Sequence, residues 1–332
     1  MTATGSDIDE AAERLARESR SLLGLPEGSS SAGWPPRRAG PPSALEFCQA
    51  VVRHTPVVMQ ACLDDRPRAP LQRWRDKAYL ASLMGERRIK VALTPDGRAD
   101  DVHRLEGGKL VFALPHEEEM TFQALFDALE RQRSGTSGAG IAYLQSQDSN
   151  LTDKEAGLAP LLADLEHGDE RRTDLPWATE ALGRRPDATN LWIGTEQSVT
   201  SMHRDHYENL FTVIQGTKIF TLYPPCEAHF LCEDEAYPVY RCTPDLGSLE
   251  PTDLPPTPWI PIDPTEPASS TRNRPFSQRF SRALPPLTVE VHEGETLYLP
   301  AGWFHHVAQR ANADSGLCVC VNWWYESETA FR

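Results

Sequence analysis

Paired cysteines, basic residues and long apolar runs are all scarce in this sequence, and each shortage excludes a class of protein. The 7 Cys are odd in number and include no Cys-Xaa-Xaa-Cys pair, so neither a disulfide framework nor a cysteine-rich zinc site is supported. Lys and Arg number 33 against 48 Asp and Glu, and the net charge of −15 argues against direct nucleic-acid binding, which needs a basic surface. No run of about 18 apolar residues occurs, and no basic start precedes an apolar run at the N-terminus, so we expect neither a membrane span nor a signal peptide. Unpaired thiols then predict a cytoplasmic or nuclear location.

The patterns along the chain predict three parts. Residues 6–23 carry apolar side chains at helical spacing before a segment rich in Pro, Gly and Ser, so we expect a helix and a flexible linker over 1–43. Residues 44–187 alternate between helical and strand patterns, which predicts an α/β region that packs on the remainder. From 188 to 332, short strands separated by Gly and Pro indicate a sandwich or barrel. We therefore expect a mainly β protein, a sandwich or barrel with helices before it.

Some segments carry more detailed expectations. Residues 71–84 predict one continuous helix. Half of the 28 Pro lie between 224 and 286, so this stretch cannot be mostly regular strand, and we expect a long insertion over the mouth or the edge of the barrel. The N-terminal helix should pack on the core, or bind a partner, through one stripe of side chains: Ile8, Ala11, Ala12, Leu15, Ser19 and Leu22.

The segment His203-Arg204-Asp205 has the spacing of two metal ligands. In a strand, side chains alternate between faces, so His203 and Asp205 would point the same way with their Cα atoms about 6.5 Å apart. A third ligand has to come from a distant strand, and residues 302–307 offer His305 or His306, of which only one can face inward. Two His and one carboxylate form the facial triad of non-haem iron oxygenases, although such a set also binds zinc.

Three longer motifs resemble the JmjC family of Fe(II)- and 2-oxoglutarate-dependent oxygenases. They are VTSMHRDHYENLFTVIQGTKIFTLYPP at 199–225, GETLYLPAGWFHHV at 294–307 and VNWWY at 321–325. The resemblance covers residues 44–326 and is greatest to the family's small lysyl hydroxylases. It implies that residues 188–332 form a double-stranded β-helix (jelly roll), the cupin-like JmjC barrel, with the insertion at 224–286.

The resemblance also implies roles for single residues. The family's iron ligands fall on His203, Asp205 and His305, and His306 would point away from the metal. The family places a Lys for the far carboxylate of 2-oxoglutarate on the strand after the His-Xaa-Asp strand, which fits Lys218. A charge partner is needed there, because burying an unpaired carboxylate is costly. Further contacts to the co-substrate and the metal shell are implied for Tyr143, Thr200, Asn209 and Asn322.

The implied activity is hydroxylation of a protein. Fe(II), 2-oxoglutarate and O₂ would act together with release of succinate and CO₂, and the expected product is 3-hydroxylysine in a partner protein. The alternatives are a JmjC lysine demethylase, a zinc-dependent isomerase of cupin type and a non-catalytic cupin-like binding module; the intact ligand set and Lys218 argue against the last two. Small hydroxylases of the family often dimerise through a C-terminal helical tail. The chain stops seven residues after Tyr325, which argues against a dimer formed through such a tail, and the sequence leaves open whether the protein forms a homodimer.

Overall fold

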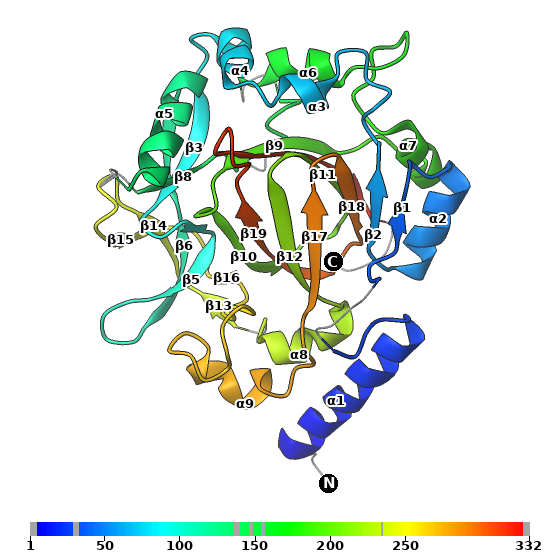
Figure 1. The fold of residues 1–332 in the computed structure, drawn as a ribbon. Helices are drawn as coiled ribbons and strands as arrows, with labels where there is room; N and C mark the ends of the chain where they lie inside the picture. The colour runs from blue at the N-terminus through cyan, green and yellow to red at the C-terminus, as the bar shows by residue number, and fades with distance from the viewer. Residues whose placement is uncertain are drawn as a thin grey trace.

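A barrel of two β-sheets lies at the centre of the molecule, with helices arranged around it (Figure 1). The computed structural model describes residues 5–28, 33–135, 140–145, 149–153, 157–233 and 235–327. This arrangement confirms the predicted mainly β, jelly-roll fold. No helix in these ranges is both long and apolar enough to cross a membrane. All seven Cys lie within them and carry free thiols.

The two sheets of the barrel consist largely of strands that are distant in sequence. The larger sheet has the order β1-β2-β18-β11-β20-β9, and the smaller has the order β17-β12-β19-β10-β4. The larger sheet comprises β1 (Arg37–Arg38), β2 (Val57–Gln60), β18 (Glu295–Leu299), β11 (Tyr207–Gln215), β20 (Cys318–Glu326) and β9 (Ala188–Gly194). The smaller sheet comprises β17 (Leu287–His292), β12 (Thr217–Tyr223), β19 (Phe304–Arg310), β10 (Val199–Arg204) and β4 (Arg98–Ala99).

Strand β20 shows how the sequence places the larger sheet between two layers. Its side chains alternate, so that Val321 and Trp323 join the core beneath the helices, whereas Cys320 packs inside the barrel and Trp324 lines a cavity there. A strand that is buried on both faces needs apolar residues at nearly every position. The near-continuous apolar run at 317–325 follows from this double burial.

Helices before the barrel cover the outer face of the larger sheet. Phe47, Trp74 and Phe122 from these helices and the loop between two of them share one apolar core with Leu210 and Trp323 of the sheet. The helices are α2 (Ala44–Arg53), α3 (Pro70–Arg73), α4 (Lys77–Met84), α5 (Phe122–Arg133), α6 (Ala159–Leu165) and α7 (Pro176–Leu182).

Two small sheets flank the barrel, and one of them incorporates part of the insertion. The first has the order β7-β3-β8, and the second has the order β15-β14-β6-β5, so that β14 of the insertion pairs with β6. Their strands are β3 (Ile89–Thr94), β5 (Asp101–Arg104), β6 (Leu110–Leu114), β7 (His116–Met120), β8 (Ile141–Tyr143), β14 (Val239–Cys242) and β15 (Leu249–Pro251). The insertion also contains α8 (Ala228–Leu231), β13 (Ala236–Tyr237), β16 (Thr257–Pro258) and α9 (Ser277–Phe280).

The single helix expected over 71–84 is wrong, because the structure forms α3 and α4 with a break between them. Trp74, which follows α3, is fully buried and donates a hydrogen bond from Nε1 to Asp164 at 2.9 Å. Asp76 then begins a new helix by accepting a hydrogen bond from the backbone N–H of Ala78 at 2.8 Å. A buried indole and a strong N-cap therefore override the apolar periodicity.

The predicted packing stripe of the N-terminal helix α1 (Gly5–Leu22) is also wrong. Ile8, Leu15 and Leu22 of that stripe are 50%, 55% and 88% exposed. The helix packs through another face on the insertion, where Arg20 and Glu227 form a fully buried ion pair. Polar partners, which an apolar-periodicity argument ignores, therefore determine the orientation of α1. Figure 1 shows α1 below α8 of the insertion.

The expected flexible linker is packed over its described part. Trp34 stacks on Trp303 with ring centroids 6.3 Å apart, and Arg37 pairs with Glu295 at 2.6 Å. Residues 29–32 lie outside the described residues.

Candidate metal centre and adjoining pocket

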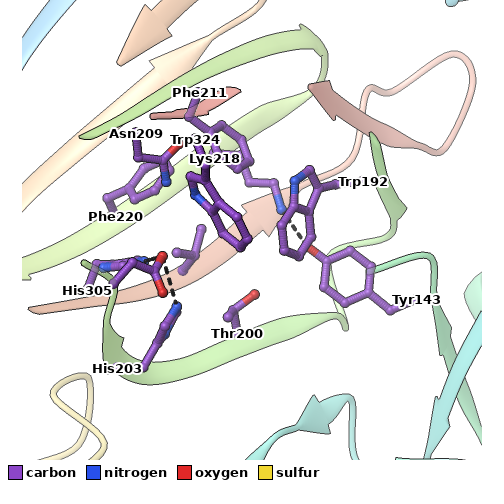
Figure 2. Close-up of a pocket in the computed structure, with 12 residues that line it drawn as sticks. Tyr143, Trp192, Thr200, His203, Asn209, Phe211, Lys218, Phe220, His305 and Trp324 are labelled. Carbon is purple, nitrogen blue, oxygen red and sulfur yellow. Dashed lines mark hydrogen bonds and ion pairs between the residues drawn. The ribbon is translucent and has the colours of Figure 1, made fainter. Parts of the chain in front are cut away.

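His203, Asp205 and His305 converge at one end of the barrel. One potential ligand atom from each lies within 4.8 Å of the other two. The Asp205 Oδ2 atom is 3.9 Å from His203 Nε2 and 3.7 Å from His305 Nε2. The two imidazole rings lie close together, with centroids 4.1 Å apart (Figure 2). Such a set could hold one metal ion and leave positions free for other ligands.

Backbone pairing and one tight turn bring these residues together. His203 on β10 lies opposite His305 on β19 in the antiparallel register. Asp205 lies one residue beyond β10, so the expectation that both motif residues belong to the strand is wrong for Asp205. Its carbonyl accepts a hydrogen bond from Gly302 N–H at 2.7 Å, which links the turn after β10 to the turn before β19. Gly302 has φ 77°, a conformation that suits glycine.

Hydrogen bonds orient both imidazoles for metal binding. His203 Nδ1 is 2.8 Å from the Ser201 carbonyl, and His305 Nδ1 is 3.0 Å from the Trp303 carbonyl. Each Nδ1 therefore carries the proton in the neutral ring, and each Nε2 presents its lone pair to the centre. Burial, aided by His203, lowers the pKa of His305 to about 4, so this ring is neutral near pH 7.

The environment of the Asp205 carboxylate also suits a metal ligand. Within the described ranges its Oδ2 atom is buried and accepts no hydrogen bond. A buried carboxylate oxygen without a donor is costly unless a cation occupies the adjacent space. The donor set of two nitrogens and one oxygen suits iron or zinc.

His306 points to the other face of β19. It pairs in register with Thr221, and its Nε2 lies 4.0 Å from the Asp263 carboxylate of the insertion. Burial lowers its pKa to about 4. The structure thus separates the two adjacent histidines, with His305 alone directed at Asp205.

A narrow cavity leads from the three residues into the barrel, and Lys218 lies in its lining. Lys218 is 1% exposed, and its Nζ donates a hydrogen bond to Tyr143 Oη at 2.9 Å (Figure 2). The rings of Tyr143 and Phe211 lie 5.2 and 5.7 Å from the ammonium. Among the residues that the structure describes, no carboxylate lies within 4.0 Å of it. A buried cation without an anion predicts an anionic ligand.

Lys218 lies on β12, which is the second strand after β10 and not the next one as expected. Strand β11 intervenes in sequence and belongs to the opposite sheet. Strand β12 nevertheless pairs with β19 in the same sheet as β10, so Lys218 and the His-Xaa-Asp segment share the barrel interior.

The other predicted residues take different positions. Thr200 and Asn209 line the cavity. Asn322 supports Asn209 from behind, because its Nδ2 donates to Asn209 Oδ1 at 3.1 Å while its Oδ1 accepts from Trp192 Nε1 at 2.8 Å. Both ends of the Asn322 amide are therefore engaged within the protein.

Several aromatic residues at the site were not predicted. Their alternation in short strands indicates burial but does not distinguish a cavity from a packed core. The unpredicted lining residues are Trp192, Phe211, Phe220, Val307 and Trp324.

Trp259 of the insertion also reaches the candidate centre. Its ring lies parallel to the His203 ring, with an interplanar angle of 2° and a centroid distance of 6.0 Å. Its Nε1 donates to Ser201 Oγ at 3.1 Å. The insertion thus contacts the side of the site that carries His203.

Comparison with known proteins gives the family. A cupin-like domain family model matches residues 42–331. The chain is 36% identical over 292 residues to the bifunctional peptidase and (3S)-lysyl hydroxylase JMJD7 of Homo sapiens, covering 87% of this chain and 83% of that protein. It is 35% identical to the lysine-specific demethylase JMJ32 of Arabidopsis thaliana, covering 86% and 80%, and 33% identical to JmjC domain-containing protein E of Dictyostelium discoideum, covering 86% and 82%. With a family model over most of its length and relatives matched over at least four fifths of theirs, the chain belongs to the cupin-like JmjC family.

Proposed function

We propose that the protein is an Fe(II)- and 2-oxoglutarate-dependent oxygenase that hydroxylates a lysine side chain in another protein. One observation carries the proposal: two imidazole Nε2 atoms and a carboxylate converge at one end of a cavity that also holds Lys218. The Lys218 ammonium is buried there without a carboxylate partner among the described residues. The first feature suits a metal with open positions, and the second suits the far carboxylate of a chelating dianion.

His203, Asp205 and His305 would hold the iron. The main-chain carbonyls behind the two imidazoles fix their orientation, so the ligands need little rearrangement on binding. When bound, the metal and 2-oxoglutarate supply the oxidising chemistry, in which O₂ is consumed and succinate and CO₂ are released.

Lys218, Tyr143 and Thr200 would bind the far carboxylate of 2-oxoglutarate. Lys218 would neutralise its charge, and the two hydroxyls would donate hydrogen bonds. Asn209 would donate to the end of the co-substrate near the metal, with Asn322 holding the Asn209 amide in place. The aromatic lining would exclude water, which strengthens these polar contacts.

The names of the relatives support a lysine substrate but divide between two reactions. JMJD7 carries a lysyl hydroxylase name and JMJ32 a demethylase name, at nearly equal identity. Demethylation is therefore the second candidate. A zinc-dependent isomerase of cupin type would not need the buried cation of Lys218. The seven free thiols support a cytoplasmic or nuclear site of action.

The product distinguishes the candidates. Iron-loaded protein should convert 2-oxoglutarate to succinate with a lysine-bearing protein partner and should leave that partner heavier by one oxygen atom. A demethylase would release formaldehyde from a methyl-lysine peptide and leave the peptide one methylene lighter. A binding module would retain the partner without releasing succinate. Intact-mass spectrometry with a parallel formaldehyde assay decides, and formaldehyde without stable oxygen addition would refute hydroxylation.

A further inference from the structure

Asp100 lies on the segment next to β10, the strand that carries His203, and has not been given a role. It follows β4, whose parallel pairing places Ala99 opposite Thr200 of the cavity lining. The Asp100 carbonyl accepts a hydrogen bond from Ser201 Oγ, two residues before His203. Its φ of 54° is left-handed, a conformation that Asp tolerates better than most residues other than glycine.

The Asp100 carboxylate has a hydrogen-bond donor but no cation. Gln145 Nε2 donates to its Oδ2 at 3.2 Å. In the described part of the chain, no Lys or Arg nitrogen lies within 4.0 Å of it, whereas the adjacent Asp101 contacts both Arg98 and Arg272. Burial raises the pKa of Asp100 to about 6, against an opposing effect of His203. Near pH 7 this is a partly desolvated negative charge, and a cation would be strongly favoured there.

The surroundings of Asp100 suit a long side chain that ends in a cation. Gln145 lies two residues after Tyr143, so the two point to the same side of an extended segment. Ser201 Oγ connects Asp100 to Trp259, because it donates to the Asp100 carbonyl and accepts from the indole Nε1. The Trp259 ring, which lies parallel to the His203 ring and packs on Phe112 with ring centroids 4.6 Å apart, gives this group an apolar neighbour.

We propose that Asp100 binds the ε-ammonium of the substrate lysine, with Gln145 orienting its carboxylate and Trp259 packing against the lysine methylene groups. The inference rests on the proposed function and deepens it. An ammonium held beside His203 places a carbon of the side chain, and not a methyl group on nitrogen, at the metal. Because methylation removes N–H donors and enlarges the cation, the subsite selects unmodified lysine. It therefore favours hydroxylation over demethylation.

The test measures binding without turnover. Protein loaded with Zn(II) and 2-oxoglutarate in the absence of oxygen is titrated with Nα-acetyl-lysine amide and with the norleucine analogue, which lacks the ammonium, and ligand-observed NMR gives the affinities. The wild type should bind the lysine probe at least about 30-fold more tightly, and Asp100→Asn should abolish the difference. The matched control Asp96→Asn, an exposed Asp in the turn before β4, should retain it. Equal binding of both probes by the wild type, or an unchanged preference in Asp100→Asn, would overturn the inference.

A second variant covers the case in which Asp100→Asn does not fold. Asp100→Glu keeps the charge and lengthens the side chain by one methylene, so the preference should move from the lysine probe toward the ornithine probe, which is one methylene shorter. An unchanged ratio of lysine to ornithine affinity would again overturn the inference.

Failure of the inference can be distinguished from failure of the proposed function. Oxygen addition to lysine peptides with equal rates in the wild type and Asp100→Asn would refute the subsite and leave the hydroxylase intact. Lysine binding that depends on Asp100, without oxygen addition to any lysine probe, would support the subsite and refute the hydroxylase.

Discussion

At the scale of the residue, the buried ammonium of Lys218 should lower the stability of the ligand-free protein and strengthen its binding of 2-oxoglutarate. Its ammonium is buried beside Tyr143, and no carboxylate of the described residues pairs with it. Lys218→Met keeps the shape of the side chain and removes the charge. The ligand-free variant should be at least as stable as the wild type, since a buried unpaired charge is lost. Its 2-oxoglutarate affinity should fall by about 3–5 kcal/mol, because the carboxylate loses its partner. Calorimetric titration and thermal unfolding measure both effects.

The chain supplies a matched control for this change. Lys109 also donates from Nζ to a tyrosine hydroxyl, that of Tyr240 at 3.1 Å, and lies over its ring at 5.1 Å, but it is exposed. Lys109→Met should change neither quantity. An undiminished 2-oxoglutarate affinity in Lys218→Met would place the anion site elsewhere.

The two adjacent histidines provide the second test. His305→Ala should weaken iron binding by more than the about 10–100-fold that outer-shell changes cost, because a direct ligand is removed. His306→Asn should retain iron, since His306 faces Asp263. Metal analysis of the two purified variants checks this. Iron retained by His305→Ala and lost by His306→Asn would reverse the assignment of the third ligand.

How far the sequence predicts single residues depends on the kind of signal. The spacing of His203-Arg204-Asp205 indicates that His203 and Asp205 share one face of a strand. It does not decide whether His305 or His306 is the third ligand, and the resemblance to the family indicates His305. The geometry agrees in directing only His305 at Asp205. Asp100 has no comparable signal, because its side chain depends on a left-handed turn and a long-range contact to Gln145.

At the scale of the element, the docking of α1 depends on one buried ion pair. Arg20→Met should destabilise the protein by about 3–5 kcal/mol, because Glu227 is left as a buried unpaired charge. The double variant Arg20→Met with Glu227→Met should recover most of that loss, since apolar side chains of similar volume can replace such a pair. Denaturant unfolding of the three proteins gives the free energies. A double variant no more stable than Arg20→Met would mean that the pair specifies the docked position of α1.

Elements were predictable where their pattern reflects burial on one or two faces. The barrel strands were found because Gly and Pro separate short apolar runs, such as that of β20. Strands β5 and β7 were missed because their sequences, DVHR and HEEEM, are largely charged. Their hydrogen bonds come from neighbouring strands that local patterns do not identify. The same limit explains why the packing face of α1 was wrong.

At the scale of the whole molecule, the net charge of −15 should affect the rate of substrate association. A lysine-rich peptide should associate more slowly as ionic strength rises from about 0.01 to about 0.15 M, because the Debye length shortens from about 30 to about 8 Å. A glutamate-rich peptide of equal length should show the opposite trend. Stopped-flow fluorescence measures both rates. Salt-independent association of the lysine-rich peptide would show that long-range charge has no role.

The link between the turns at Asp205 and Gly302 has a consequence for how the chain is held closed. A metal bound by His203, Asp205 and His305 would act as a cross-link between two positions about 100 residues apart, with the whole insertion inside the closed loop. Trp259 lies within that loop and rests on His203. Metal occupancy should therefore govern the integrity of the loop as well as the reaction, and chelation should render the insertion susceptible to limited proteolysis before the barrel unfolds. The bound ion would therefore act as a reversible cross-link between these two parts of the chain.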